Sequence, residues 1–132
     1  MNAQRPSSRY EESRILNAGR EQLLLLTYDG LLRFLARARR GIEGRDYDEK
    51  HLGFSRAQTI VLELHRTLDF GAAPELAGNL ARIYLYLLEE LARADSEDDG
   101  ARVGGAIEIV MELRTAWAEA AGRGTAGAEE GG

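Results

Sequence analysis

The most apolar stretch of the chain, residues 23–42, repeats its hydrophobic positions with the period of an α-helix. Spacings of three and four residues place one stripe on a single helix face: Leu24, Tyr28, Leu31, Leu35, Ala38 and Ile42. Leu23, Leu26 and Phe34 lie outside that stripe, so the helix is apolar over more than half its circumference. Such a helix needs neighbours on two or three sides, which predicts a bundle. Gly30, in its middle, indicates close approach of a neighbouring helix.

The next segment carries a single hydrophobic stripe and predicts a second helix. Its start is expected at Asp46 or Asp48, because a short acidic side chain caps a helix and suits the positive end of its dipole. The stripe consists of Phe54, Ala57, Ile60, Val61, Leu64 and Leu68. Polar residues occupy the opposite face, so this helix is amphipathic rather than buried all round.

A third helix is predicted from Pro74, which is tolerated in a first helical turn, to about Ala94. Its main stripe is Leu76, Leu80, Ile83, Leu87 and Leu91. Four more apolar residues lie beyond that stripe: Tyr84, Leu85, Tyr86 and Leu88. The third helix therefore has, like the first, more apolar surface than one core needs, and the excess predicts a surface for a partner.

An acidic turn over residues 95–100 precedes the fourth predicted helix, with Asp98 or Asp99 suited to its start. The apolar positions of this helix are Val103, Ile107, Val110, Leu113 or Arg114, and Trp117. We expect it to end near Ala121, before a glycine-rich stretch.

Four helices joined by short turns predict an all-α fold, an antiparallel four-helix bundle over residues 16–122. Asn17 suits the N-cap of the first helix, with Glu21 in its first turn.

The two ends of the chain have a different composition from the bundle. Residues 1–15 are polar without a sustained period and predict a mobile N-terminal arm. Tyr10 and Ile15 interrupt that polarity; they are either incidental or form a short apolar latch laid on the bundle. Residues 123–132 are rich in glycine and alanine and predict a disordered tail.

Composition narrows the classes of function. The chain has 132 residues, enough for one domain with a real core, and no cysteine, which excludes disulfides and thiolate metal sites. A net charge of -5 disfavours nucleic acid and anionic membranes as partners. The local exception, Arg37, Arg39 and Arg40, is typical of a solvated helix end. With neither a signal peptide nor an uninterrupted membrane span, we expect a cytoplasmic protein without membrane insertion.

Residues able to do chemistry are few. His51 and His65 are the only histidines, and neither belongs to the Glu-x-x-His pairs that a di-iron bundle needs. Lys50 is the only lysine, Ser55 and Ser96 have no histidine at useful spacing, and no glycine-rich phosphate loop is present. We therefore expect no catalytic residue, no metal site and no cofactor.

Because no residues suited to catalysis or metal binding are found, we expect the protein to act by binding a partner through shape and apolar contact. Tyr28, Tyr84 and Tyr86 either complete the core or present a ring to a partner while the hydroxyl stays in water. Because apolar positions are in excess on two helices, at least one of these tyrosines is expected to be accessible. An open apolar groove would dock amphipathic helices of a partner.

A set of short motifs, in this order and spacing, resembles the FliS family of flagellar export chaperones. The motifs, which cover about residues 10 to 120, are Tyr10, Leu23 to Leu26, Tyr28-Asp29-Gly30, Ala57, Ile60, Glu63-Leu64, Leu68-Asp69, Asn79-Leu80, Tyr84-Leu85-Tyr86, Leu91 and Arg114-Thr115-Ala116-Trp117. The chain departs from the family where Gly19-Arg20 replaces a usual Ser-Pro.

The resemblance implies a cytoplasmic helical-bundle chaperone that binds the disordered C-terminal segment of flagellin. It would prevent premature polymerisation and assist flagellar type III export, with an export-gate component and other flagellar regulators as further partners. In the family, the segment around Tyr10 can lie on the bundle as a cap with which flagellin competes.

We expect the first helix to be mainly scaffold and the anchors for flagellin to be Tyr10, Ile15, Leu64, Leu68, Ile83, Tyr84, Tyr86 and Leu87. One alternative is a generic helical-bundle adaptor that binds an amphipathic helix of another protein. A second, an enzyme or metal-binding bundle, is disfavoured by the residue inventory.

Overall fold

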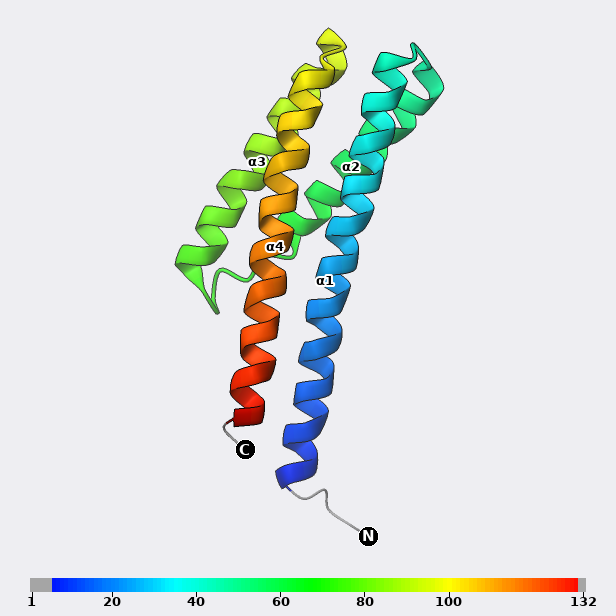
Figure 1. Ribbon diagram of the computed structural model, residues 1–132. Helices are drawn as coiled ribbons and strands as arrows, with labels where there is room; N and C mark the ends of the chain where they lie inside the picture. Colours follow the sequence, from blue (N-terminus) through cyan, green and yellow to red (C-terminus); the bar gives the residue numbers. More distant parts are fainter. Residues whose placement is uncertain (1–5, 131–132) are drawn as a thin grey trace.

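The computed structural model describes the backbone of residues 6–130 and the side chains of residues 19–123. Within that part, the chain forms four helices and no strand: α1 (Pro6–Glu43), α2 (Tyr47–Arg66), α3 (Pro74–Glu97) and α4 (Gly100–Glu130). Consecutive helices run in opposite directions, and the long helices α1 and α4 lie side by side (Figure 1). Helices α2 and α3 complete the ring, each touching one long helix and the other short one. The predicted all-α bundle is confirmed.

Three signals that begin helices act as the sequence predicts. The Asp46 side chain caps α2 by accepting the Glu49 backbone N–H at 3.2 Å. Pro74 occupies the first turn of α3, where its missing N–H costs no helical bond. In the turn before α4, Asp99 Oδ1 accepts the Arg102 backbone N–H at 3.1 Å. These short-range contacts explain why the turns fall where the sequence places them.

The outer ends of the long helices differ from the prediction. The α1 backbone begins at Pro6, so the cap expected at Asn17 is wrong, and the helix continues through Gly19. No proline or glycine lies between Pro6 and Gly19, and a single glycine costs only about 1 kcal/mol in a helix. Helix α4 likewise continues past Ala121 to Glu130.

The predicted arm over residues 1–15 and the tail over residues 123–132 remain predictions, because all their side chains except Arg123 lie outside the described residues. The same holds for Tyr10 and Ile15.

The core lies along the shared axis of the four helices and uses the predicted stripes. Its buried members are Tyr28, Leu31, Leu35, Ala38, Phe54, Ala57, Val61, Leu64, Leu80, Tyr84, Leu87, Leu91, Ala94, Val103, Ala106 and Val110. Leu76 is the exception among the stripe residues, with 48% of its surface exposed. Ala94 and Ala106 are core residues that the predicted stripes did not include.

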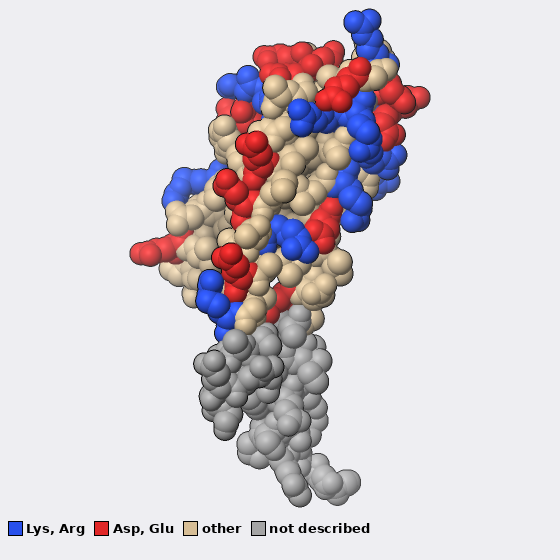
Figure 2. Space-filling model, viewed as in Figure 1, with Lys and Arg blue, Asp and Glu red and all other residues tan. Residues whose placement is uncertain are grey.

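Ion pairs connect the helices near the α1–α2 turn. Arg37 Nε donates to Glu49 Oε1 at 2.6 Å, which links α1 to α2. Lys50 Nζ lies 3.1 Å from Asp95 Oδ1, which links α2 to α3. Hydrogen bonds to Asp98 and Asp95 raise the pKa of Lys50, so the ammonium stays charged. Figure 2 shows both acidic and basic side chains at this end of the bundle. Arg39 pairs with Glu43 at 3.2 Å as Arg37 does with Glu49, so the arginine cluster is a partly paired helix end.

Candidate functional site

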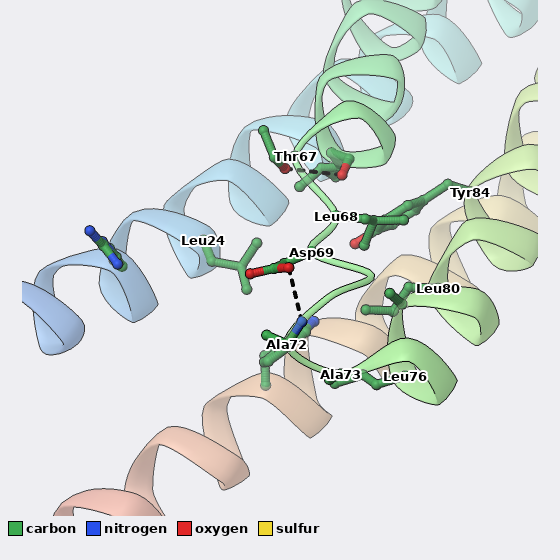
Figure 3. A pocket seen from close by; sticks show the side chains of 13 residues that line it. Leu24, Thr67, Leu68, Asp69, Ala72, Ala73, Leu76, Leu80 and Tyr84 are labelled. Atoms are coloured by element: carbon green, nitrogen blue, oxygen red, sulfur yellow. Dashed lines mark hydrogen bonds between the residues drawn. The ribbon is translucent and has the colours of Figure 1, made fainter.

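A hollow of about 420 Å³ opens where α2 turns into α3. Residues from all four helices and from the α2–α3 loop line it: Arg20, Leu24, Leu64, Thr67, Leu68, Asp69, Ala72, Ala73, Leu76, Ala77, Leu80, Tyr84 and Trp117. Figure 3 shows Leu24, Leu68, Leu80 and Tyr84 arranged around this space, which we call the apolar hollow. A cavity of this size with mainly aliphatic and aromatic walls is suited to burying apolar groups of a ligand.

The loop that floors the apolar hollow is held by its own hydrogen bonds. Asp69 Oδ1 accepts the backbone N–H groups of Gly71 and Ala72, each at 3.0 Å. Figure 3 shows the bond to Ala72. Thr67 Oγ1 donates to the carbonyl oxygen of Leu64 at 3.0 Å, where α2 ends. An aspartate that bonds to the backbone two and three residues ahead stabilises a turn. The shape of the hollow is therefore present before any partner binds.

Three aromatic residues from three helices, which we call the aromatic triad, are joined by hydrogen bonds beside the apolar hollow. The hydroxyl oxygens of Tyr28 on α1 and Tyr84 on α3 lie 2.6 Å apart, and both side chains are buried. Trp117 on α4 donates its indole N–H to the Tyr28 hydroxyl oxygen at 3.0 Å. Trp117 and Tyr84 line the hollow, whereas Tyr28 lies behind them. The triad ties three helices together at the place where the hollow opens.

An ion pair sets the register of α1 against α4 beside this triad. Arg114 Nη2 donates to Asp29 Oδ2 at 3.2 Å, in a two-bonded pair. Tyr28 and Asp29 are neighbours on α1, and their partners Arg114 and Trp117 lie three residues apart on α4. The hydrogen bond from Arg114 lowers the pKa of the Asp29 carboxyl group.

The triad predicts a loss of stability in alkali. Burial raises the pKa of Tyr28 and Tyr84, and the bond to Tyr28 raises the pKa of Tyr84 further. Both phenols therefore keep their protons in the fold when the unfolded chain, with phenol pKa values of about 10, loses them. The free energy of unfolding should not depend on these two groups below about pH 10, and above it should fall by up to about 2.7 kcal/mol per pH unit.

Urea unfolding followed by circular dichroism at several pH values tests this expectation. The double variant Tyr28→Phe/Tyr84→Phe is the control, since it keeps Lys50 and the other tyrosines. If the free energy of unfolding falls equally steeply with pH in the wild-type protein and in the double variant, the triad does not cause the loss of stability in alkali.

The predicted anchor residues fall in three places. Leu64, Leu68 and Tyr84 line the apolar hollow. Leu87 lies in the core with 1% of its surface exposed, and Ile83 is half-buried against that core. Tyr86 is 50% exposed, on the side of α3 away from the core, and its hydroxyl donates to Glu90 at 3.3 Å.

The sequence leaves open whether each of three tyrosines belongs to the core or to a surface for a partner, and the structure gives different answers for them. Tyr28 and Tyr84 complete the core, and Tyr86 is accessible. The apolar excess predicted for the first and third helices is exposed in part, at Leu23, Leu26, Leu85 and Tyr86. Phe34 and Leu88 are instead partly buried against the core.

Sequence reasoning missed several walls of the apolar hollow. Leu24 contributes from α1, which was expected to be mainly scaffold, and Trp117 contributes from α4. Leu76 was assigned to the core stripe, yet it lies in the first turn of α3, beside the loop, where the bundle ends. Its place two residues after Pro74, in the first turn of the helix, is the signal that could mark it as a rim residue.

The fold and the hollow define a helical-bundle binding protein. Among the described side chains, no three His, Asp or Glu residues come together in a way that could hold a metal ion. None of the described helices is both long enough and apolar enough to cross a membrane.

The family model of flagellar protein FliS matches residues 2–124, and the chain belongs to this family. It is therefore a flagellar secretion chaperone and not an enzyme.

Named relatives agree with this assignment. The chain is 29% identical over 120 residues to the flagellar secretion chaperone FliS of Bacillus subtilis, covering 91% of this chain and 89% of the relative. It is 31% identical over 99 residues to FliS of Campylobacter jejuni, covering 75% and 77%. It is 30% identical over 106 residues to FliSB of Pseudomonas aeruginosa, covering 80% and 84%.

Proposed function

We propose that this chaperone binds the disordered C-terminal segment of flagellin in the cytoplasm, keeps it from polymerising, and assists its type III export. The observation that carries the proposal is the preformed apolar hollow. Relatives that share most of the chain's length are flagellar secretion chaperones, so the segment bound there is expected to belong to a secreted flagellar subunit.

Physical chemistry favours a segment that is disordered when free. Such a segment loses conformational entropy on binding, so its affinity depends on many apolar contacts over a long surface. The apolar hollow offers a deep contact, and the exposed Leu23 and Leu26 on α1 and Leu85 and Tyr86 on α3 offer shallower ones. A segment that wraps from one helix to the next would cover both kinds of site.

We assign the central anchor contacts to Leu64, Leu68 and Tyr84 in the hollow. Ile83 and Tyr86 would act on α3, with Leu87 supporting them from the core. In this proposal Tyr10 and Ile15 form a latch that the flagellin segment displaces, and export-gate components or other flagellar regulators bind the loaded chaperone.

Trp117 makes the proposal directly testable, because it is the only tryptophan and lines the apolar hollow. Titration with a flagellin C-terminal peptide that lacks tryptophan should change the indole emission and saturate at one peptide per chain. A sedimentation assay of flagellin polymerisation should show inhibition at the same ratio. An unrelated amphipathic helix that binds equally well would favour the generic adaptor, and unchanged emission with bound flagellin peptide would place the contact elsewhere.

A further inference from the structure

The aromatic triad contains more donor protons than hydrogen bonds. The indole N–H of Trp117 and the hydroxyls of Tyr28 and Tyr84 supply three protons. One is donated from Trp117 to the Tyr28 oxygen, and one lies between the two hydroxyl oxygens, which are 2.6 Å apart. One hydroxyl proton is left without an acceptor among the described residues.

The position of that proton depends on which hydroxyl donates to the other. If Tyr84 donates, the remaining proton belongs to Tyr28, which is fully buried behind the hollow and has no further acceptor among the described side chains. If Tyr28 donates, the remaining proton belongs to Tyr84, whose side chain reaches from α3 toward Leu68 with its oxygen at the hollow (Figure 3). An unpaired donor in a dry core is costly, so an acceptor placed in the hollow selects the second arrangement.

The second arrangement also has a favourable direction. Trp117 donates to Tyr28, Tyr28 to Tyr84, and Tyr84 to whatever occupies the hollow. In such a series each hydroxyl that accepts a hydrogen bond becomes a better donor for the next. The raised pKa of Tyr84 is consistent with a hydroxyl that keeps its proton at any physiological pH.

We propose that the segment bound in the apolar hollow places a neutral oxygen acceptor, a backbone carbonyl or a Ser, Thr, Asn or Gln side chain, against the Tyr84 hydroxyl among its apolar anchors. A carboxylate is disfavoured because it would lose its hydration among the mainly apolar walls of the hollow, which costs far more than burying a neutral acceptor. This inference rests on the proposed function, since it specifies the chemistry of the flagellin segment that the hollow would hold.

The variants Tyr84→Phe and Tyr28→Phe form a matched pair for the test. Each removes one hydroxyl and the same Tyr28–Tyr84 hydrogen bond, and each keeps its ring. Tyr28→Phe also removes the acceptor of the Trp117 indole N–H, so urea unfolding should show the larger loss of stability for Tyr28→Phe. Only Tyr84→Phe removes the donor that faces the hollow. Its Kd for the flagellin C-terminal peptide should rise about five- to tenfold, whereas Tyr28→Phe should change the Kd less than about twofold. Calorimetry is the appropriate readout, because Tyr28→Phe itself alters the surroundings of the Trp117 indole.

The outcomes separate this inference from the proposed function. The acceptor bond would be overturned if the wild-type protein binds the peptide and Tyr84→Phe binds it with the same Kd, or if both variants lose affinity equally. Either result would leave flagellin binding itself intact. Failure of the wild-type protein to bind the peptide would overturn the proposed function, and the acceptor bond with it.

Discussion

Replacing Gly53 by alanine is expected to lower the free energy of unfolding by about 2 kcal/mol. An added Cβ would lie 2.4 Å from the backbone nitrogen and 2.7 Å from the Cα of Ala38, so α1 and α2 must move apart. Overpacking against backbone costs up to about 3 kcal/mol, and the gain of about 1 kcal/mol in helix propensity offsets only part of it. Thermal unfolding followed by circular dichroism should show a Tm lower by on the order of 5–10 °C.

Gly30→Ala is the matched control, since Gly30 is also a buried glycine in a helix of the same pair. A Cβ there would meet Arg33 Nη2 at 3.6 Å and Ile60 Cδ1 at 4.0 Å, which are ordinary contacts. The control should raise the free energy of unfolding by up to about 1 kcal/mol. A change of the same sign in both variants would mean that the α1–α2 distance is not limited at Gly53.

Replacing Leu76 by glutamate is expected to weaken binding of the flagellin C-terminal peptide by at least about 2 kcal/mol, a factor of about 30 in Kd. The side chain lines the apolar hollow and is 48% exposed in the free protein, so a bound apolar segment would bury the new carboxylate. The fold should tolerate the change, because an acidic residue in the first turn of α3 suits the helix dipole.

Leu85→Glu is the control for this second prediction. Leu85 lies on the same helix with a similar exposure, 53%, but it does not line the hollow. Calorimetric titration of both variants should show a much larger loss of affinity for Leu76→Glu, with urea unfolding near wild type for each. Comparable losses of affinity would indicate that the segment binds along the outer face of α3 and that the hollow is not its main contact.

Much of the fold could be predicted from short-range patterns. The stripe from Leu24 to Ile42 predicts the buried face of α1, and Asp46 and Pro74 mark where α2 and α3 begin. Each of these signals depends on residues within one or two helical turns. The prediction that the helix starts at Asn17 is wrong because the residues before Asn17 are helical too. A residue that suits an N-cap does not stop a helix from extending past it when the preceding residues also favour helix.

The close approach of α1 and α2 could not be located in the same way. The sequence marks Gly30 as unusual in a long apolar helix, but the tight contacts occur at Gly53, against Ala38, and at Gly41, against Lys50. All of these glycines lie in helices, and only the way in which the axes of α1 and α2 cross decides which glycine meets the backbone of the other helix.

The candidate site was predicted in part. The hydrophobic pattern predicts an excess of apolar residues on the first and third helices, and part of that excess is exposed on α1 and α3, whereas Tyr84 is buried. The sequence predicts Leu64, Leu68 and Tyr84 as anchors, and all three line the hollow, whereas Leu24, Leu76 and Trp117 line it without having been predicted as anchors. Amphipathicity shows that a face needs covering, but it does not show whether another helix of the same chain already covers it.

By itself, the sequence determined that this protein is a bundle of helices with more apolar surface than its core uses, and the order of its motifs indicated a flagellar export chaperone. Only the tertiary structure decided that Tyr28, Tyr84 and Trp117, from three different helices, meet at one hydrogen-bonded wall beside a hollow. Helix periodicity depends on neighbours three and four residues apart, whereas this wall joins residues 56 and 89 positions apart. Contacts of that kind depend on how whole helices pack, and no local pattern encodes them.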